Sequence, residues 1–327
     1  MTIKIKKKNC GETNKKLSRI LVTGALGFMG SYLCKELLNI GERVIGLNRN
    51  SSSKNYLRID SIKHNPNFNM IYADFSKTNM TEYLDDIDII YHCGAKSFVN
   101  FSIIDPEPFI ENNIIGTYNM LEALRKSNVK KYIQISTDEV YGSCSGEPFT
   151  EESPLKPGNP YSSSKASADM LAISYHNTYG LPIIISRSEN IYGPYQGKEK
   201  VIPHFVKLCL EGKSMTLYGD GSNTRRWLHL RDQCSALYLL SQKGNNGEIY
   251  NVASEEEISN LELSKKIAKV LKVPEKIIFI EDRLGHDKRY AIDVSKLKSL
   301  GWKPKYTLDT VFEDVINWYK KNQWWLN

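Results

Sequence analysis

The sequence TGALGFMG, Thr23 to Gly30, follows the apolar run RILVT at 19–23 and precedes a segment whose apolar residues recur at helical spacing. A glycine-rich turn between a strand and a helix is the setting in which a dinucleotide fingerprint holds a pyrophosphate. Gly24 would allow the tight turn, Gly27 the close approach of phosphate, and Gly30 close packing of helix on strand. The unpaired N–H groups and positive dipole end of the helix would complete an anion site. A purely structural glycine turn is the alternative interpretation.

The strand–turn–helix pattern continues beyond this turn. Short β-branched runs alternate with helical stretches, of which two long ones cover about 106–127 and 160–179. Nearly continuous apolar strands are typical of a parallel sheet buried on both faces, and right-handed crossovers then give a doubly wound arrangement. We therefore predict an α/β fold with a parallel Rossmann sheet. Its further strands are predicted at RVIGL (43–47), FNMIYA (68–73), IDIIYH (87–92), KYIQIS (131–136) and PIIIS (182–186).

The chain divides into parts that differ in composition and in their predicted elements. Residues 1–17 form a lysine-rich tail predicted to be flexible, and 18–187 carry the dinucleotide-binding Rossmann pattern. We predict that 188–327 form mainly a smaller, mixed α/β substrate-binding domain, and that a segment at about 228–252 returns to the Rossmann domain. The QWWLN segment at 323–327 is expected to dock on the body, since adjacent Trp side chains rarely stay fully exposed. Helices of the second part are predicted near 201–211, 231–242, 259–272 and 308–320.

Composition narrows the function classes. The 327-residue chain is 41% hydrophobic and 25% charged, which is ordinary for a globular protein. Its net charge of +7 is concentrated in residues 1–19, so the body offers no electrostatic case for nucleic acid. No apolar run approaches the ~20 residues of a membrane span, and no secretory signal is expected. The six cysteines contain no CxxC pair, which predicts no metal site and a reducing, cytoplasmic location.

The second predicted strand ends at Asn48 and Arg49, where NAD-specific proteins usually carry an acid that binds the adenosine ribose. An amide beside a guanidinium would also accept a 2′-phosphate, so NAD is the expected cofactor and NADP the alternative. Asp74, after the third strand, is positioned either to meet the adenine or to cap a helix. The remaining predicted cofactor contacts are Phe28, Met29 and Phe75.

Tyr161 and Lys165 lie four residues apart in YSSSK, at the start of a predicted helix. This spacing puts both side chains on one face. A lysine ammonium near a phenol, beside a cationic nicotinamide, favours the phenolate and would make Tyr161 a base near neutral pH. The pair is common by chance, but here it follows a glycine fingerprint and a strand.

The sequence STDEVYG at 136–142 ends another predicted strand. Thr137, Asp138 and Glu139 would therefore lie at the carboxyl edge of the sheet, where open α/β sheets bind ligands. A hydroxyl, a carboxyl that can be protonated and a carboxylate base would suit a reaction that removes water. Two acids held close also push their pKa values apart, which assigns acid and base roles. Exposed loop acids with a helix cap are the alternative.

Together these motifs give the chain a family resemblance, which runs from about Arg19 to the C-terminal helix. It resembles the nucleotide-sugar 4,6-dehydratases of the extended short-chain dehydrogenase/reductase superfamily, and most of all the members that act on dTDP-glucose. The resemblance lies in TGALGFMG, STDEVYG, PYSSSKASAD, NIYGPYQGKEKVIP, GDGSNTRRWLHLRD and RLGHDKRYAID.

The resemblance implies a reaction cycle that begins and ends with the oxidised cofactor. Tyr161 would deprotonate the hexose C4 hydroxyl as hydride leaves C4, while Thr137 orients that hydroxyl and Lys165 holds the ribose and tunes Tyr161. Glu139 would remove the C5 proton as Asp138 protonates the departing C6 hydroxyl. Hydride return to C6 would then give a 4-keto-6-deoxy sugar. Tight retention of the cofactor is expected, because it is regenerated in place.

The resemblance also implies substrate contacts and a homodimer through helices 106–127 and 160–179. Arg225 is the expected diphosphate ligand. The chain departs from the family pattern at Asn48, which leaves the cofactor open between NAD and NADP. It also departs at SFVN (97–100) and at RRW (225–227), so the nucleotide (dTDP, UDP, CDP or GDP) and the hexose or N-acetylhexosamine stay open. The expected substrate contacts are Thr137, Asn190, Lys200, Arg225, Asn251, Arg283 and His286.

Two other functions fit parts of this pattern. A 4-epimerase or decarboxylase on the same scaffold would share Tyr161 and Lys165, would lose no water and would be indifferent to Asp138→Asn. A non-catalytic NAD(P)-binding regulator would be expected to have lost a catalytic residue, and each residue of the set is present.

Overall fold

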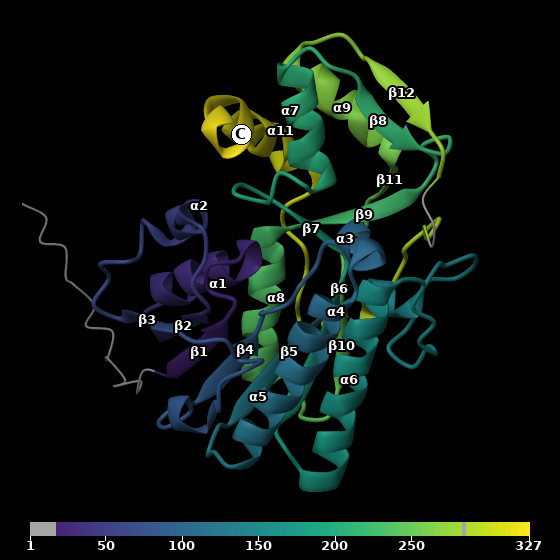
Figure 1. Cartoon of the computed structure of the whole chain (residues 1–327). Coiled ribbons are helices and arrows are strands. Elements are labelled where there is room, and N and C mark those ends of the chain that lie inside the picture. The colour runs from purple at the N-terminus through teal and green to yellow at the C-terminus, as the bar shows by residue number, and fades with distance from the viewer. Residues whose placement is uncertain (1–17, 283–285) are drawn as a thin grey trace, which may run out of the picture.

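The computed structural model describes residues 18–282 and 286–327 (Figure 1). The predicted flexible tail at 1–17 lies outside the described residues. The first part of the chain contains β1 (Arg19–Thr23), α1 (Phe28–Asn39), β2 (Arg43–Asn48), α2 (Ser53–Tyr56), β3 (Phe68–Tyr72), β4 (Ile89–His92), α3 (Val99–Ile104), α4 (Glu107–Phe109), α5 (Gly116–Arg125), β5 (Lys131–Thr137), α6 (Pro160–Tyr179) and β6 (Ile183–Ser188).

The second part adds shorter elements, joined by longer loops. They are β7 (Asn190–Tyr192), α7 (Val201–Leu210), β8 (Met215–Tyr218), β9 (Thr224–His229), α8 (Leu230–Lys243), β10 (Ile249–Val252), β11 (Glu257–Ser259), α9 (Asn260–Leu271), β12 (Ile277–Ile280), α10 (Ser295–Ser299) and α11 (Leu308–Lys321). Single helical turns are η1 (Leu57–Ile59), η2 (Thr81–Tyr83), η3 (Ile110–Ile115), η4 (Asp138–Tyr141) and η5 (Gln323–Trp325).

Seven parallel strands form the central sheet in the order β10-β6-β5-β4-β1-β2-β3. Val22 of β1 packs with α1 and α8 on one face, while Leu21 packs with α5 and α6 on the other (Figure 1). This alternation explains the continuous apolar runs, because every position of a strand covered on both faces is buried. The predicted doubly wound Rossmann sheet is confirmed.

The strand order reverses between β1 and β4, and a crevice outside the carboxyl ends of the strands is expected at such a switch point. The glycine turn follows β1, and Asp138 and Glu139 follow β5, so both motifs lie at this edge. The sheet topology therefore brings together two motifs that lie more than a hundred residues apart.

A second lobe lies above this edge in Figure 1. It contains a three-stranded sheet, β11-β9-β7, and a two-stranded sheet, β12-β8. Residues of α7, α9 and α11 form its own apolar core together with Trp325. β10 joins the central sheet and α8 packs against it, although both follow the start of the second part. The division into domains proposed from the sequence stays a prediction.

The helix expected over 106–127 is not uniform. It consists of α4, the π-helical turn η3 and α5. Asn113, within the π-helical turn, bonds the Lys96 N–H at 2.8 Å and the Ser164 hydroxyl at 2.8 Å. The wider turn thus ties the loop after β4 to α6, and such turns are frequent near functional sites.

None of the helices in the described parts of the chain is long and apolar enough to cross a lipid bilayer.

Candidate active site

The glycine turn is packed too closely to accept side chains. Gly24 has φ +67°, and a Cβ there would lie 2.9 Å from the Gly94 Cα. A Cβ on Gly30 would lie 2.3 Å from the Gly24 carbonyl oxygen. Gly27 caps α1 without a side chain that could bond its first N–H groups. These donors therefore face a cradle of bare backbone, which fits the pyrophosphate of a dinucleotide.

The predicted adenosine contacts lie together at the ends of β2 and β3. Asn48 accepts the Leu26 N–H at 3.3 Å and so ties β2 to the glycine turn. Arg49 lies 3.8 Å from the Asp74 carboxylate. Asp74 also accepts bonds from the N–H and hydroxyl of Ser76 at 3.0 and 2.7 Å, a local turn rather than the cap of a helix.

The other predicted cofactor residues differ in burial. Phe75 is buried, and its ring would collide with a Cβ on Gly94 or Gly116. This packing favours a structural role for Phe75 beneath the site. Phe28 and Met29 open α1 and are partly buried.

Thr137 organises the acid pair at the end of β5. Its hydroxyl accepts the Glu139 N–H at 3.3 Å and donates to the Asp138 carboxylate at 3.1 Å. The second carboxylate oxygen of Asp138 is buried without a hydrogen-bond partner among the described residues. Burial, and then the negative charge of Glu139, raise the pKa of Asp138 to about 8. Asp138 is thus a protonated acid near neutral pH, as the sequence predicts for one member of the pair.

Tyr161, near the start of α6, lies beside Thr137 and the acid pair. Asn159 and Ser162 form a capping box that fixes the start of this helix. Burial, and then the charge of Glu139, raise the pKa of Tyr161, and a hydrogen bond from Thr137 opposes that rise. Thr137, Asp138, Glu139 and Tyr161 are therefore mutual neighbours.

Lys165 is held by the backbone of β5. Its Nζ donates to the Ile135 carbonyl at 2.6 Å, and burial lowers the pKa of the ammonium. The largest contributions to the pKa of Tyr161 are burial, the nearby acids and the hydrogen bond from Thr137. The expectation that the Lys165 ammonium, beside a cationic nicotinamide, favours the phenolate stays a prediction.

A buried ion pair, which the local sequence pattern does not predict, adjoins the site. Asp169 accepts bonds from Arg187 and from the Ser136 hydroxyl, both at 2.9 Å. Arg187 also donates to the Tyr141 hydroxyl at 2.9 Å, and Tyr141 donates to Asn251 at 2.9 Å. The signal in the sequence was the spacing of four residues between Tyr161, Lys165 and Asp169, which places all three on one face of α6.

Glu189 is a second buried residue that no motif in the sequence marks. It lies between β6 and the predicted substrate contact Asn190, and it accepts the Ser254 N–H at 2.5 Å. Burial raises the pKa of its carboxyl, and the charge of Asp138 adds to the rise. The amide nitrogen of Asn190 is buried without a hydrogen-bond partner among the described residues, so it is available to a ligand.

The remaining predicted substrate contacts differ in their burial and in their hydrogen-bond partners. Arg225 donates to the carbonyls of Thr224, Lys288 and Asp287 at 2.7, 3.3 and 2.8 Å. Asn251 is fully buried and donates to the Phe149 carbonyl at 3.2 Å. This geometry favours structural roles for both.

Lys200 is half-buried at the start of α7, whereas only 5% of the His286 side chain is exposed. Lys200 donates to the Ser97 carbonyl at 2.7 Å, and His286 lies 2.5 Å from the Asp282 carboxylate. Arg283 lies outside the described residues. The roles of the seven expected contacts in substrate binding stay predictions.

Comparison with known proteins agrees with this fold. Residues 21–315 match the family model described as GDP-mannose 4,6 dehydratase, and the chain belongs to this family. The resemblance to nucleotide-sugar 4,6-dehydratases is therefore confirmed.

Three individual proteins show how similar the chain is to members with a known name. The dTDP-glucose 4,6-dehydratase of Haemophilus influenzae is 37% identical over 94% of this chain and 99% of its own. The low-salt glycan biosynthesis protein Agl12 of Haloferax volcanii is 40% identical over 92% and 98%. The crystal structure of DesIV, a dTDP-glucose 4,6-dehydratase from Streptomyces venezuelae solved with NAD bound, is 36% identical and superposes with a TM-score of 0.91 over 94% of this chain and 98% of that chain.

Gly30→Ala is expected to weaken NAD binding about tenfold or more, because an added methyl overpacks the turn against backbone that cannot move aside. Isothermal titration of the purified variant with NAD measures this loss. Gly146→Ala is the matched control, since a Cβ there meets nothing within 4 Å. Equal affinities of both variants would contradict a phosphate-binding role for the turn.

Proposed function

We propose that the protein is an NAD-dependent nucleotide-sugar 4,6-dehydratase with dTDP-glucose as its substrate. The observation that carries this proposal is the convergence of Asp138 and Glu139, one protonated at neutral pH, on Tyr161 at the sheet edge that also carries the glycine turn. An acid and a base on neighbouring positions are what the removal of water across C5 and C6 requires. The similarity to dTDP-glucose 4,6-dehydratases supports the choice of sugar nucleotide.

Bound NAD supplies the hydride acceptor for C4, the hydride donor for C6 and a positive ring charge beside the phenol. Tyr161 takes the proton of the C4 hydroxyl, which Thr137 orients. Lys165, fixed by the Ile135 carbonyl, lies one helical turn further along the same face of α6 and holds the cofactor ribose.

Asp138 and Glu139 carry out the elimination of water. Once C4 is a ketone, the C5 proton is acidic and Glu139 removes it. Asp138 gives its own proton to the departing C6 hydroxyl, which leaves as water. The raised pKa of Asp138 assigns it the acid role, because a carboxyl must be protonated to donate. A 4-epimerase would have no use for a protonated acid in this position, so the geometry favours dehydration.

Incubation with a panel of nucleotide-linked hexoses is expected to give, for dTDP-glucose, a product lighter by one water in mass spectra.

Glu139→Gln is expected to allow oxidation at C4 but to block elimination, so that reduced nicotinamide accumulates and absorbs in the near ultraviolet. The control is Glu152→Gln, which should behave as wild type because Glu152 is an exposed acid in the loop after η4. Normal product formation by Glu139→Gln would remove the base role assigned to this residue.

The dehydration rate is expected to fall as pH rises through about 8, because deprotonated Asp138 cannot donate a proton. Above this pH the loss should approach about tenfold per unit. A pH profile of kcat measures it, with NAD affinity followed over the same range as the control. A rate that climbs through pH 8 to 9 would show that Asp138 is not the acid.

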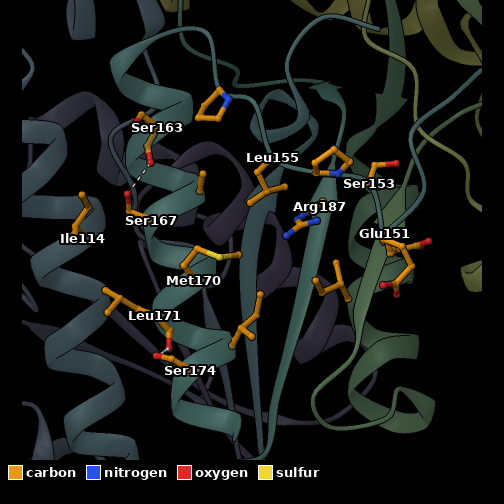
Figure 2. A pocket seen from close by; sticks show the side chains of 16 residues that line it. Ile114, Glu151, Ser153, Leu155, Ser163, Ser167, Met170, Leu171, Ser174 and Arg187 are labelled. Carbon is orange, nitrogen blue, oxygen red and sulfur yellow. Dashed lines mark hydrogen bonds between the residues drawn. The ribbon is translucent and has the colours of Figure 1, made fainter. Parts of the chain in front are cut away.

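We also propose that two copies associate through α5 and α6. Five apolar side chains on these helices and on η3 form the helix patch, which consists of Ile110, Ile115, Tyr118, Met170 and Tyr179. Each is 45–51% exposed, and a cluster of this kind is typical of an interaction surface. Beside the patch lies a hollow of about 940 Å³ between α6 and residues 151–157, into which Met170 and Leu155 project (Figure 2).

Met170→Glu is expected to convert a dimer into a monomer, because a charge at the centre of an apolar interface loses its hydration on association. Sedimentation velocity measures the change. Ile40→Glu is the matched control, since Ile40 is 53% exposed but follows α1 on the opposite face of the sheet. A wild-type protein that sediments as a monomer would contradict the dimer.

A cytoplasmic location is part of the same proposal. It is supported by free cysteines at Cys34, Cys93, Cys144, Cys209 and Cys234, because thiols stay reduced in that compartment.

A further inference from the structure

Arg58, in the turn η1, joins the glycine turn to the second lobe. Its Nη1 donates to the Leu26 carbonyl at 2.9 Å, and its Nε donates to the Tyr195 carbonyl at 3.1 Å. Leu26 lies inside the glycine turn, whereas Tyr195 lies in the loop from β7 to α7. The planar guanidinium can make both bonds at once because its donors point in fixed, divergent directions.

Trp325 covers this guanidinium. The Arg58 Cζ lies 4.8 Å from the centre of the Trp325 ring, and the indole N–H donates to the Gln196 carbonyl at 2.8 Å. Trp325 is 2% exposed, whereas its neighbour Trp324 is 48% exposed and bonds Asn322 in the same turn. A cation over an indole face is held more strongly when water is excluded from the pair.

Side chains of both lobes bond the segment that carries Trp325. Lys54 of α2 and Lys198 of the β7–α7 loop each donate to the Asn327 carbonyl at 2.9 Å. The C-terminal coil accordingly lies next to α2 in Figure 1. Arg58 and Trp325 line a hollow of about 480 Å³ together with Phe28, the first residue of α1, and Lys200. The contact is therefore adjacent to the predicted phosphate-binding turn.

We infer that Arg58 and Trp325 are positioning residues that hold the glycine turn against the second lobe and so slow the release of the dinucleotide. Arg58 acts through the Leu26 peptide and contacts none of the reacting atoms. The inference rests on the proposed function, because a dehydratase that returns its hydride to the same sugar must keep its cofactor between the two transfers. Release requires the lobes to separate at this point, and the Arg58 bonds oppose that separation.

The test is the rate at which NAD leaves the purified holoenzyme when it is diluted into a scavenger, in the absence of any sugar nucleotide. Arg58→Met keeps the length of the stem but removes the bonds to both lobes, and it should speed release about tenfold or more, since one charge-assisted hydrogen bond alone is worth about this factor. Trp325→Leu should speed release similarly, while the matched control Trp324→Leu should not. The double variant should release NAD no faster than the faster single variant, because the two residues act on one contact.

Two further variants separate positioning from general stability. Trp325→Phe keeps a ring over Arg58 and should stay close to the wild-type rate, even if loss of the Gln196 bond lowers its melting temperature. Arg58→Lys keeps the charge but loses the divergent N–H donors of the guanidinium, and it should release NAD faster than wild type. If Trp325→Leu does not fold, Arg58→Met and Arg58→Lys provide the measurement.

The possible outcomes distinguish this inference from the proposed function. A wild-type protein that retains NAD, with Arg58→Met and Trp325→Leu releasing it at the wild-type rate, overturns the positioning role alone. Additive effects in the double variant also overturn it, because the two residues would then act separately. A wild-type protein that binds no NAD overturns the proposed function itself.

Discussion

One buried carboxylate, that of Asp169, connects the elements that form the catalytic edge. It links α6 to β5 through Ser136 and to β6 through Arg187. Arg187 in turn bonds Tyr141 in η4. An ion pair removed from water is tolerated only when its hydrogen bonds are well made, so small displacements of any of these elements carry a large penalty. Because Tyr161 and Lys165 precede Asp169 at intervals of four residues, the same pair fixes the face of α6 that they occupy.

Burial at this edge also sets the protonation states. Removal from water disfavours charge, so the pKa values of Asp138 and Tyr161 rise and that of Lys165 falls. The free site therefore holds a neutral acid and a neutral phenol rather than a preformed phenolate. In the proposed mechanism, the positive charge of bound NAD would favour the Tyr161 phenolate, so that proton abstraction would be coupled to cofactor binding.

The two lobes meet at the glycine turn. Within the first lobe, the turn is fixed by Asn48 at the Leu26 N–H. From the same peptide, the Leu26 carbonyl bonds Arg58, which also bonds the second lobe at Tyr195. The peptide that should approach the pyrophosphate is thus held on both sides. This arrangement connects the second lobe, which carries several of the expected substrate contacts, to the cofactor site.

Much of the fold and the site could be predicted from local pattern. The glycine spacing at Gly24, Gly27 and Gly30, the strand runs and the long helix at 160–179 are local features, because they follow from which residues fit a tight turn, a doubly buried strand or a helix face. The positions of Asp138, Glu139 and Tyr161 at one edge followed from the rule that parallel strands share their carboxyl ends. The π-helical turn at 110–115 was missed, because it reflects the side-chain bonds of Asn113 to Lys96 and Ser164 rather than helix propensity.

Partners that come from distant segments were decided only by the tertiary structure. Asp169 and Arg187, or Arg58 and Trp325, are ordinary residues in a sequence, and nothing local says that they meet. The hydrogen-bond partners of Lys165 and Arg225, the Ile135 and Asp287 carbonyls, likewise come from distant segments. The sequence by itself determined which groups are present and which edge of the sheet they reach. Only the folded chain decided which of them are buried together, and burial is what fixes their charge and their partners.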